Sequence, residues 1–400
     1  MKVTTDNLMI PGTNALTLPL HSGTPPRYLV RRMIKLAGCI SKVLIDSYGT
    51  LEFLKRLSDP LWFQAFGCVL GFDWHSSGVT TVVMSVLKQS VLPESHGIAI
   101  TGGKGKKSKE TLKEVSTICG DSFNFCDSII SELSYASKMS AKIDNSAIQD
   151  GYHLYHHNLV FDGEGYWCII QQGMNISNHT SRRYHWLSTR IKDRCFVIEP
   201  HTGLIGAIYQ SNRVLDMTSK NSLENQKTCV DILNDHKNIK DLNLSIKPLV
   251  SRSRDTKLDT WMMDKGMTTG SLNLLQPISN ALYSMPARVD WDLVRQIHEI
   301  QPKNYENFLS IKGVGPSTIR AISLIAELIF GCKASWDDPI RFTFAFGGKD
   351  GVPHPIDRKS YDQSISFLQS AIEGAEISSD ERKETLKRLA QYSSKLTNFD

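Results

Sequence analysis

The sequence lacks the features that mark secreted and membrane proteins. Its longest apolar runs, such as Ala321 to Phe330, fall far short of the roughly 20 residues that a bilayer-spanning helix needs. The N-terminus shows no basic segment followed by an apolar core. The eight cysteines form no CxxC pair and no closely spaced framework. We therefore expect a soluble, cytoplasmic protein with reduced, mostly buried thiols and no membrane partner.

The chain also lacks a strong charge and an internal repeat. A net charge of +5 on 400 residues is a weak indication of nucleic-acid binding, because a solvated surface of mixed sign gives the same value. Lysine and arginine are almost balanced by acidic residues over 286–400. Any phosphate-binding surface must therefore be local. The hydrophobic content of 40% is enough for a full core, divided at ordinary domain sizes into two or three units.

Hydrophobic spacing predicts an α+β protein with a helical N-terminal part. An amphipathic helix begins after Pro25 and Pro26, a second begins at a Ser58 cap and ends at Gly71, and a third begins at Ser76 or Ser77. We expect a helical or mixed part over 1–135, a β-rich part over 136–215 that forms one unit with it, a polar connector over 216–285, and an all-helical domain over 286–400.

Basic residues line one face of the first expected helix. Arg27, Arg31 and Lys35 follow one another at one-turn spacing. Two interpretations stay open: a subsidiary surface that contacts phosphates, or a face that is simply solvated.

Strand-like runs in the middle of the chain predict a β-hairpin. Residues 154–161 and 166–172 flank the turn Asp162-Gly163-Glu164-Gly165. Pairing of Phe161 with Tyr166 would set His157 opposite Ile170 and His156 opposite Gln171. A further strand is expected over 195–198.

A glycine-rich turn near the C-terminus carries the main functional prediction. Residues 304–310 form a short helix, 311–315 a tight turn, and 316–328 a second helix, as in a helix-hairpin-helix element. Both glycines of the turn permit positive φ and the close approach of a phosphate, and we expect the free amides at the start of the second helix to point at that anion. Such a contact reads no bases. The predicted DNA-binding residues are Lys312, Gly313, Val314, Gly315, Ser317, Thr318 and Arg320. The alternative is a structural role, in which the glycine-rich turn only packs the two helices and binds no ligand.

An acidic residue and a histidine share a short loop between two apolar helices. Asp73 and His75 have the side-chain chemistry to bind a divalent metal ion, Mg²⁺ or Mn²⁺, or to act in general acid-base catalysis. Equally, Asp73 can be a helix cap and His75 an interface histidine.

The hairpin region concentrates imidazole, amide and guanidinium groups beside apolar strands. This favours a functional cleft, although each histidine can instead satisfy a backbone group. Arg182 and Arg183 are expected to clamp phosphate. With Asp73 and His75, the candidate catalytic residues are His156, His157, Gln171, Gln172, Arg183 and His185.

Two nuclease designs use such parts, and the sequence departs from both. A restriction-like core needs a lysine after the glutamine strand, and none follows Gln171 and Gln172. A histidine-metal hairpin core needs ligands on a helix after the second strand, and Asn175 and His179 match that spacing only loosely.

Several long and unusual strings occur along the chain: LPLHSG (18–23), RLSDP (56–60), FQAFGCVLGFDWHSSG (63–78), QQGMN (171–175), RYHW (183–186) and DRK (357–359). They resemble a prokaryotic family catalogued only as domain of unknown function 763, over roughly residues 13–372. The resemblance implies an intracellular, DNA-associated protein and supplies no established catalytic residues.

These observations favour a protein of DNA processing or repair, with metal-dependent cleavage of duplex or structured DNA as the leading hypothesis. The competing hypothesis is a DNA-binding protein without catalysis that serves chromosome maintenance. A nucleotide-binding enzyme that uses the basic segment 102–107 is a weaker third, because no Ser or Thr follows in P-loop spacing. For that segment we expect a flexible basic loop.

Overall fold

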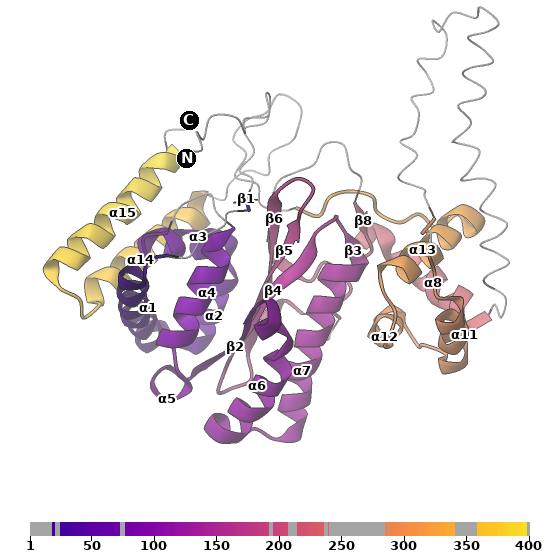
Figure 1. The fold of residues 1–400 in the computed structure, drawn as a ribbon, viewed down its shortest axis with the longest axis horizontal. Helices are drawn as coiled ribbons and strands as arrows, with labels where there is room; N and C mark the ends of the chain where they lie inside the picture. Colours follow the sequence, from indigo (N-terminus) through magenta and orange to yellow (C-terminus); the bar gives the residue numbers. More distant parts are fainter. Residues whose placement is uncertain are drawn as a thin grey trace, which may run out of the picture.

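The computed structural model describes residues 18–20, 25–72, 77–191, 195–206, 214–235, 239, 285–286, 288–340 and 358–397. It confirms the α+β class. A six-stranded antiparallel sheet lies at the centre, in the order β1-β6-β5-β4-β2, with β7 paired to β6 as well. Helices cover both of its faces (Figure 1). The strands are β1 Leu18–Pro19, β2 Ile98–Lys104, β4 His153–Asp162, β5 Trp167–Asn175, β6 Thr180–Leu187 and β7 His201–Ile205. A small second sheet pairs β3 Ile148–Gln149 with β8 Leu215–Asp216.

One face of the sheet packs against N-terminal and C-terminal helices together. Val160, Cys168 and Ile170 point from the sheet into this core. Leu368 and Leu389 enter the same core from the end of the chain, which brings distant segments side by side (Figure 1). The helices are α1 Arg27–Tyr48, α2 Thr50–Ser58, α3 Pro60–Val69, α4 Gly78–Ser90, α14 Arg358–Gly374 and α15 Ser379–Thr397, with the short α5 Pro93–His96 beside them.

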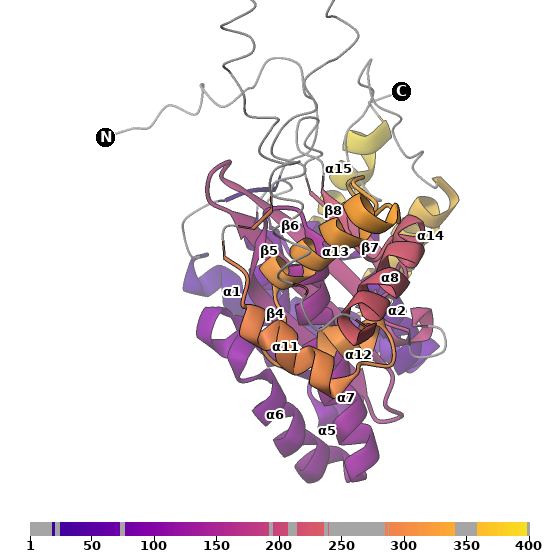
Figure 2. The same ribbon diagram turned by 90° about the vertical axis from the view of Figure 1, so that its right-hand side faces the viewer.

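The other face packs against the middle of the chain and the 291–330 helices. Leu159, Phe161 and Ile169 point into this second core, which Phe308 and Ile322 complete. Figure 2 shows this side of the molecule, with α11, α12 and α13 in front of the sheet. The helices are α6 Thr111–Ile118, α7 Asp127–Lys142, α8 Leu223–Asp235, α11 Trp291–Ile300, α12 Tyr305–Ser310 and α13 Pro316–Phe330, and a π-helical segment, Ile143–Ala147, follows α7.

The three N-terminal helices expected from hydrophobic spacing are present, with one different cap. Met33, Ile40 and Leu44 of α1 are buried, as the 3.6-residue period requires. Asp59, rather than Ser58, caps the next apolar helix, because its carboxylate accepts the N–H groups of Leu61 (2.8 Å) and Trp62 (3.2 Å). The expected second helix is therefore α3, and α2, which precedes the Asp59 cap, was not predicted.

The hairpin is present, but the predicted register is wrong by one residue. Phe161 pairs with Trp167, so His157 lies opposite Gln171 and His156 opposite Gln172. The turn holds one residue more than expected, because the Asp162 N–H donates to the Tyr166 carbonyl at 3.0 Å across it. A shift of one residue changes every cross-strand pair, so the predicted neighbours do not meet.

Two further local expectations are wrong. Residues 195–198 form turns and not a strand. The basic segment expected as a flexible loop is ordered, since Gly102 to Lys104 belong to β2 and Gly105–Lys109 form a 3₁₀ helix. Within the expected connector over 216–285, α8 is a helix, and its Cys229 and Leu233 are buried in the second core.

The helices of 286–400 do not share one core among the described residues. Those of 291–330 pack on one face of the sheet, and those of 358–397 pack on the other. No described helix combines the length and apolar character that a membrane span requires. All eight cysteines are free thiols, of which Cys119, Cys168 and Cys229 are buried and Cys126 is exposed.

Candidate functional site

The turn between α12 and α13 has the predicted backbone at one of its two glycines. Gly313 lies in the left-handed region, with φ of 93°. Val314 is buried, and its N–H donates to the Ile311 carbonyl at 3.3 Å. Gly315 has φ of −140° and ψ of −175°, so it does not use the positive φ that glycine permits. Gly315 is the N-cap of α13, a position that takes an extended backbone.

The start of α13 presents N–H groups without a cap. Gly315 offers no side-chain acceptor, and Pro316 occupies the first helical position and has no N–H. The N–H of Ile319 donates to the Gly315 carbonyl at 3.1 Å. The N–H groups of Ser317 and Thr318 precede that bond, so helix geometry gives them no partner within α13. They carry the partial positive charge of the helix end.

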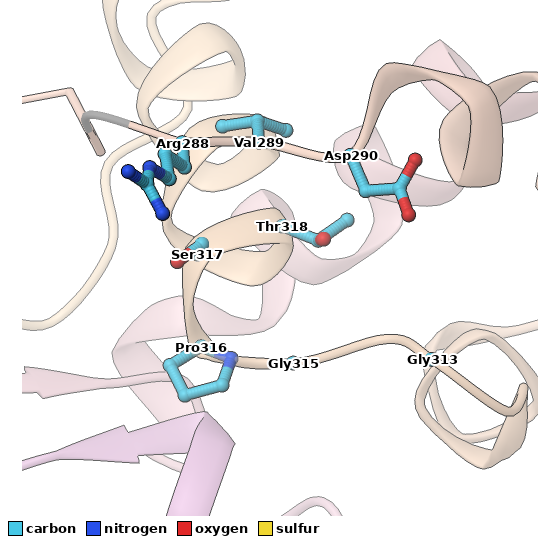
Figure 3. Close-up of a pocket in the computed structure, with 8 residues that line it drawn as sticks. All are labelled: Arg288, Val289, Asp290, Gly313, Gly315, Pro316, Ser317 and Thr318. Atoms are coloured by element: carbon cyan, nitrogen blue, oxygen red, sulfur yellow. The ribbon is translucent and has the colours of Figure 1, made fainter.

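A cavity of about 400 Å³ lies at this helix end (Figure 3). Gly313, Gly315, Pro316, Ser317 and Thr318 line one side of it. Arg288, Val289 and Asp290, which precede α11, line the other.

One wall of the cavity carries both a guanidinium group and a carboxylate. The exposed Arg288 side chain extends toward Ser317 in Figure 3. The Asp290 carboxylate already accepts the Leu293 N–H at 2.9 Å as the cap of α11. The cavity therefore combines helix amides with a guanidinium group, which is an arrangement suited to an anion.

The remaining predicted DNA-binding side chains differ in their access to solvent. Lys312 is exposed on the turn, whereas Thr318 is buried. The guanidinium of Arg320 stacks on the Trp336 ring at 5.2 Å and donates to Gln149 Oε1 at 3.3 Å. Burial lowers the pKa of Arg320. Lys312 is thus open to a ligand, and Arg320 is engaged inside the protein.

The helical pair α12–α13 is attached to the rest of the protein by polar contacts. Tyr135 of α7 donates to Glu306 Oε1 at 2.6 Å. Lys142 donates to the Ile311 carbonyl at 3.5 Å, and Gln149 of β3 donates to the Pro316 carbonyl at 2.9 Å. These contacts fix the turn relative to the sheet.

The predicted catalytic residues of the hairpin region fall on opposite faces of the sheet. Side chains alternate along a strand, so Gln171 shares the face of Ile169 and Gln172 shares the face of Ile170. All six residues are at most 6% exposed. His157 and Gln171 lie on the face of the second core, and Gln172, Arg183 and His185 lie on the opposite face.

A buried carboxylate, Asp144, organises the polar groups on the first of these faces. Its Oδ2 accepts Gln171 Nε2 at 2.6 Å and Trp186 Nε1 at 2.9 Å, and its Oδ1 accepts His201 Nε2 at 2.6 Å. Gln171 Oε1 contacts His157 Nδ1 at 3.0 Å. An amide oxygen only accepts, so His157 carries its proton on Nδ1 and its Nε2 accepts the hydroxyl of Ser137 at 2.8 Å.

Arg183 organises the polar groups on the opposite face. Its guanidinium lies over the Phe63 ring at 4.4 Å and donates to His185 Nε2 at 2.8 Å, to Thr80 Oγ1 at 3.3 Å and to Gln64 Oε1 at 3.2 Å. Burial and the adjacent guanidinium lower the pKa of His185. These groups bond to one another inside the fold, and Arg183 does not lie at the surface as a phosphate clamp would.

Arg182, the second expected clamp, also lies inside the protein. Its guanidinium donates at 2.8 Å to both Asp150 Oδ2 and Asp338 Oδ2. Burial alone would lower its pKa, but the two carboxylates raise it. Arg182 therefore joins β6 to the segment that follows α13, and its two carboxylate partners replace the phosphate that the sequence suggested.

The metal prediction lies outside the described residues, because Asp73 and His75 belong to 73–76. Their neighbour Ser77 is described, and its carbonyl accepts Gln172 Nε2 at 2.9 Å. In the described part of the chain, His, Cys, Asp and Glu side chains form no group of three or more that is able to hold a metal ion.

Sequence reasoning missed the acidic partners Asp144, Asp150 and Asp338. The signal available was indirect: polar side chains on apolar strands require buried partners. Spacing does not reveal which carboxylates provide them, because Asp144 lies 42 residues from Trp186 and Asp338 lies 156 residues from Arg182.

The fold and the sites described above define an α+β protein with a glycine turn at a helix start and two buried polar clusters. A family model described as "Protein of unknown function (DUF763)" matches residues 14–356. The chain belongs to this family, as its sequence strings predict. No curated protein and no solved structure matches the chain.

Proposed function

We propose that α12–α13 is a helix-hairpin-helix element through which this protein binds the sugar-phosphate backbone of DNA. The observation that carries the proposal is the cavity at the start of α13, where uncapped amides of Ser317 and Thr318 lie beside Arg288. Backbone amides and a guanidinium recognise a phosphate and not a base, so we expect binding without sequence preference. DNA is the proposed ligand because its backbone presents the same phosphate group at every nucleotide.

The arrangement of the other predicted residues favours binding without catalysis. A nuclease would need its metal-binding or water-activating group and its cations beside one scissile phosphate. The described candidates are instead buried and divided between two faces of the sheet. Cleavage with Mg²⁺ or Mn²⁺ through Asp73 and His75 stays a separate prediction.

The binding proposal predicts a specific salt dependence. Lys312→Glu should reduce the slope of log affinity against log salt by about 1, because one phosphate contact is lost. Lys303→Glu is the matched control, since Lys303 is exposed just before α12, whereas Lys312 is in the turn directly before the cavity residue Gly313. Fluorescence anisotropy with unrelated duplexes measures both. Equal slopes for the two variants would refute the assignment of this turn.

A cleavage assay with the same protein distinguishes a DNA-binding protein without catalysis from a nuclease. Single-stranded, duplex and branched DNA should be incubated with wild-type protein and either metal. Intact substrates under conditions where binding is measured support the non-catalytic function. Cleavage that is abolished by Asp73→Ala would instead establish the nuclease and place its site at 73–75.

A further inference from the structure

The segment 104–113 concentrates positive charge at the surface. It holds five lysines, and Glu110 is its one acidic residue. All five lysines are exposed, and none of them forms an ion pair with a described residue: Lys104, Lys106, Lys107, Lys109 and Lys113. The next acidic residue, Glu114, is paired with Lys88 at 2.8 Å. The positive charge of the segment is therefore not balanced locally.

Hydrogen bonds hold this segment in a fixed shape. At its start, the Gly102 carbonyl accepts Lys88 Nζ at 2.9 Å and the Gly102 N–H donates to Glu114 Oε2 at 2.7 Å. Within it, the Ser108 hydroxyl donates to the Gly105 carbonyl at 2.7 Å. Because the backbone is already ordered, a ligand that binds the lysines does not have to order a loop, and binding costs less conformational entropy.

Helix α7 connects the segment to the turn between α12 and α13. It contacts α6 on one side and α12 on the other (Figure 1). Lys138 of α7 is exposed and lines the same hollow as Lys109. Lys142 follows four residues later, on the same side of the helix, and donates to the Ile311 carbonyl of the turn at 3.5 Å. A line of lysines therefore runs from the segment over α7 to Lys312.

We propose that one DNA duplex contacts both ends of this line, at the α12–α13 turn and at Lys109 and Lys138. The inference rests on the proposed function, because the turn supplies the first contact. From Lys138 to Lys142 the axis of α7 rises about 6 Å, whereas successive phosphates of one DNA strand advance by about 3.4 Å. The two contacts therefore fall on different phosphates.

A duplex suits two separate contacts better than a single strand does. Its persistence length is about 150 base pairs, so it is straight on the scale of this surface and engages both ends of the line without being ordered first. A single strand would lose conformational freedom between the two contacts.

The second contact orients the protein and reads no sequence. Lysine is a point charge on a flexible stem, which attracts a phosphate without selecting a base. A protein that is attached to the backbone at the turn alone is free to rotate about that point. With Lys109 and Lys138 engaged as well, the direction of α7 relative to the duplex is fixed.

The salt dependence of duplex binding, measured by fluorescence anisotropy, tests the proposal. The test variant is Lys109→Gln/Lys138→Gln, in which two exposed side chains change and the core does not. The control is Lys383→Gln/Lys387→Gln, which removes the same charge from exposed positions of α15, on the opposite face of the sheet. We expect the slope of log affinity against log salt to fall in magnitude by about 2 in the test variant, and to stay unchanged in the control.

A combined variant and the stoichiometry test whether one duplex makes both contacts. Adding Lys312→Glu to the test variant should bring the total loss of slope to about 3, because each contact involves its own phosphates. Titration of wild-type protein at concentrations far above the dissociation constant should end at one duplex per chain.

Two results would overturn the inference. One is a test variant whose slope equals that of the control. The other is a wild-type protein that binds two duplexes per chain, which would assign the turn and the lysines to separate DNA molecules. Failure of the proposed function gives a different pattern: Lys312→Glu would leave the slope unchanged while Lys109→Gln/Lys138→Gln reduces it. That pattern would remove the turn from the DNA contact, and the shared duplex with it.

Discussion

Three histidines lie in the middle of the sheet with almost no access to solvent. Burial lowers the pKa of His156 to about 3, and the nearby His157 and Lys104 lower it too. Burial also lowers the pKa values of His157 and His185. Each ring is therefore neutral in the folded protein, whereas the unfolded chain binds a proton at each below about pH 6.5.

These shifts predict acid-sensitive stability. A group whose pKa is lower in the folded state stabilises the fold above its unfolded pKa, and that stability falls as the pH decreases below it. Each histidine should contribute a slope of about 1.4 kcal/mol per pH unit below about pH 6.5. Urea unfolding of wild type and His156→Gln between pH 7 and pH 4 measures the difference. A slope that stays the same in the variant would mean that His156 is protonated in the native protein.

At the scale of elements, Arg182 connects three parts of the chain. It lies on β6, Asp150 follows β3, and Asp338 lies beyond α13. Asp150 also accepts the hydroxyl of Tyr184 at 2.6 Å and the N–H of Tyr152 at 3.0 Å. The ion pairs therefore help to position α13, and with it the turn that we propose binds DNA.

Removal of either carboxylate partner of Arg182 should destabilise the protein, and the loss should be larger for the more deeply buried partner. Asp150→Asn should cost about 3–5 kcal/mol, because a fully buried partner of a buried cation is lost. Asp338→Asn should cost about 1–3 kcal/mol, since its side chain is 12% exposed and Arg182 keeps Asp150. The exposed neighbour Asp337→Asn is the control and should change stability by less than about 0.5 kcal/mol. The opposite ranking in chemical denaturation would show that this ion-pair network does not stabilise α13.

The sequence predicted correctly those elements that a local pattern of residues determines. The period of α1, the glycine stop at Gly71 and the proline start of α13 were sufficient because helix geometry depends on near neighbours. The predicted register of the hairpin was wrong because the register depends on one hydrogen bond across the turn, from the Asp162 N–H to the Tyr166 carbonyl. The predicted central residues do not share one cleft, because strand alternation places Gln171 and Gln172 on opposite faces. Two residues that are adjacent along a strand point to opposite faces of the sheet, so their side chains do not meet.

On the scale of the whole molecule, one sheet separates two hydrophobic cores (Figure 1). The family match ends at residue 356, just before α14 begins at Arg358. The basic residues Arg27, Arg31 and Lys35 are exposed on α1, which covers the face opposite to α12–α13. Hydrogen bonds from Ser378 lower the pKa of Glu381 on α15, and the positive charge of Lys35 lowers it as well. The α1 surface is thus remote from the proposed DNA contact.

That separation provides a control for the central claim, which the variant Ser317→Asp tests most directly. Ser317 is exposed in the first turn of α13, where a carboxylate interacts favourably with the helix dipole by about 0.3–1 kcal/mol. The same carboxylate repels a phosphate and competes with it for the amides. Binding to unrelated duplexes at physiological salt, measured beside thermal unfolding, should be at least about tenfold weaker in a protein that is no less stable. Arg27→Glu/Arg31→Glu should change affinity by no more than about threefold, because charges beyond the Debye length are screened. If Ser317→Asp folds and binds every duplex as tightly as wild type does, the start of α13 is not the DNA-binding site.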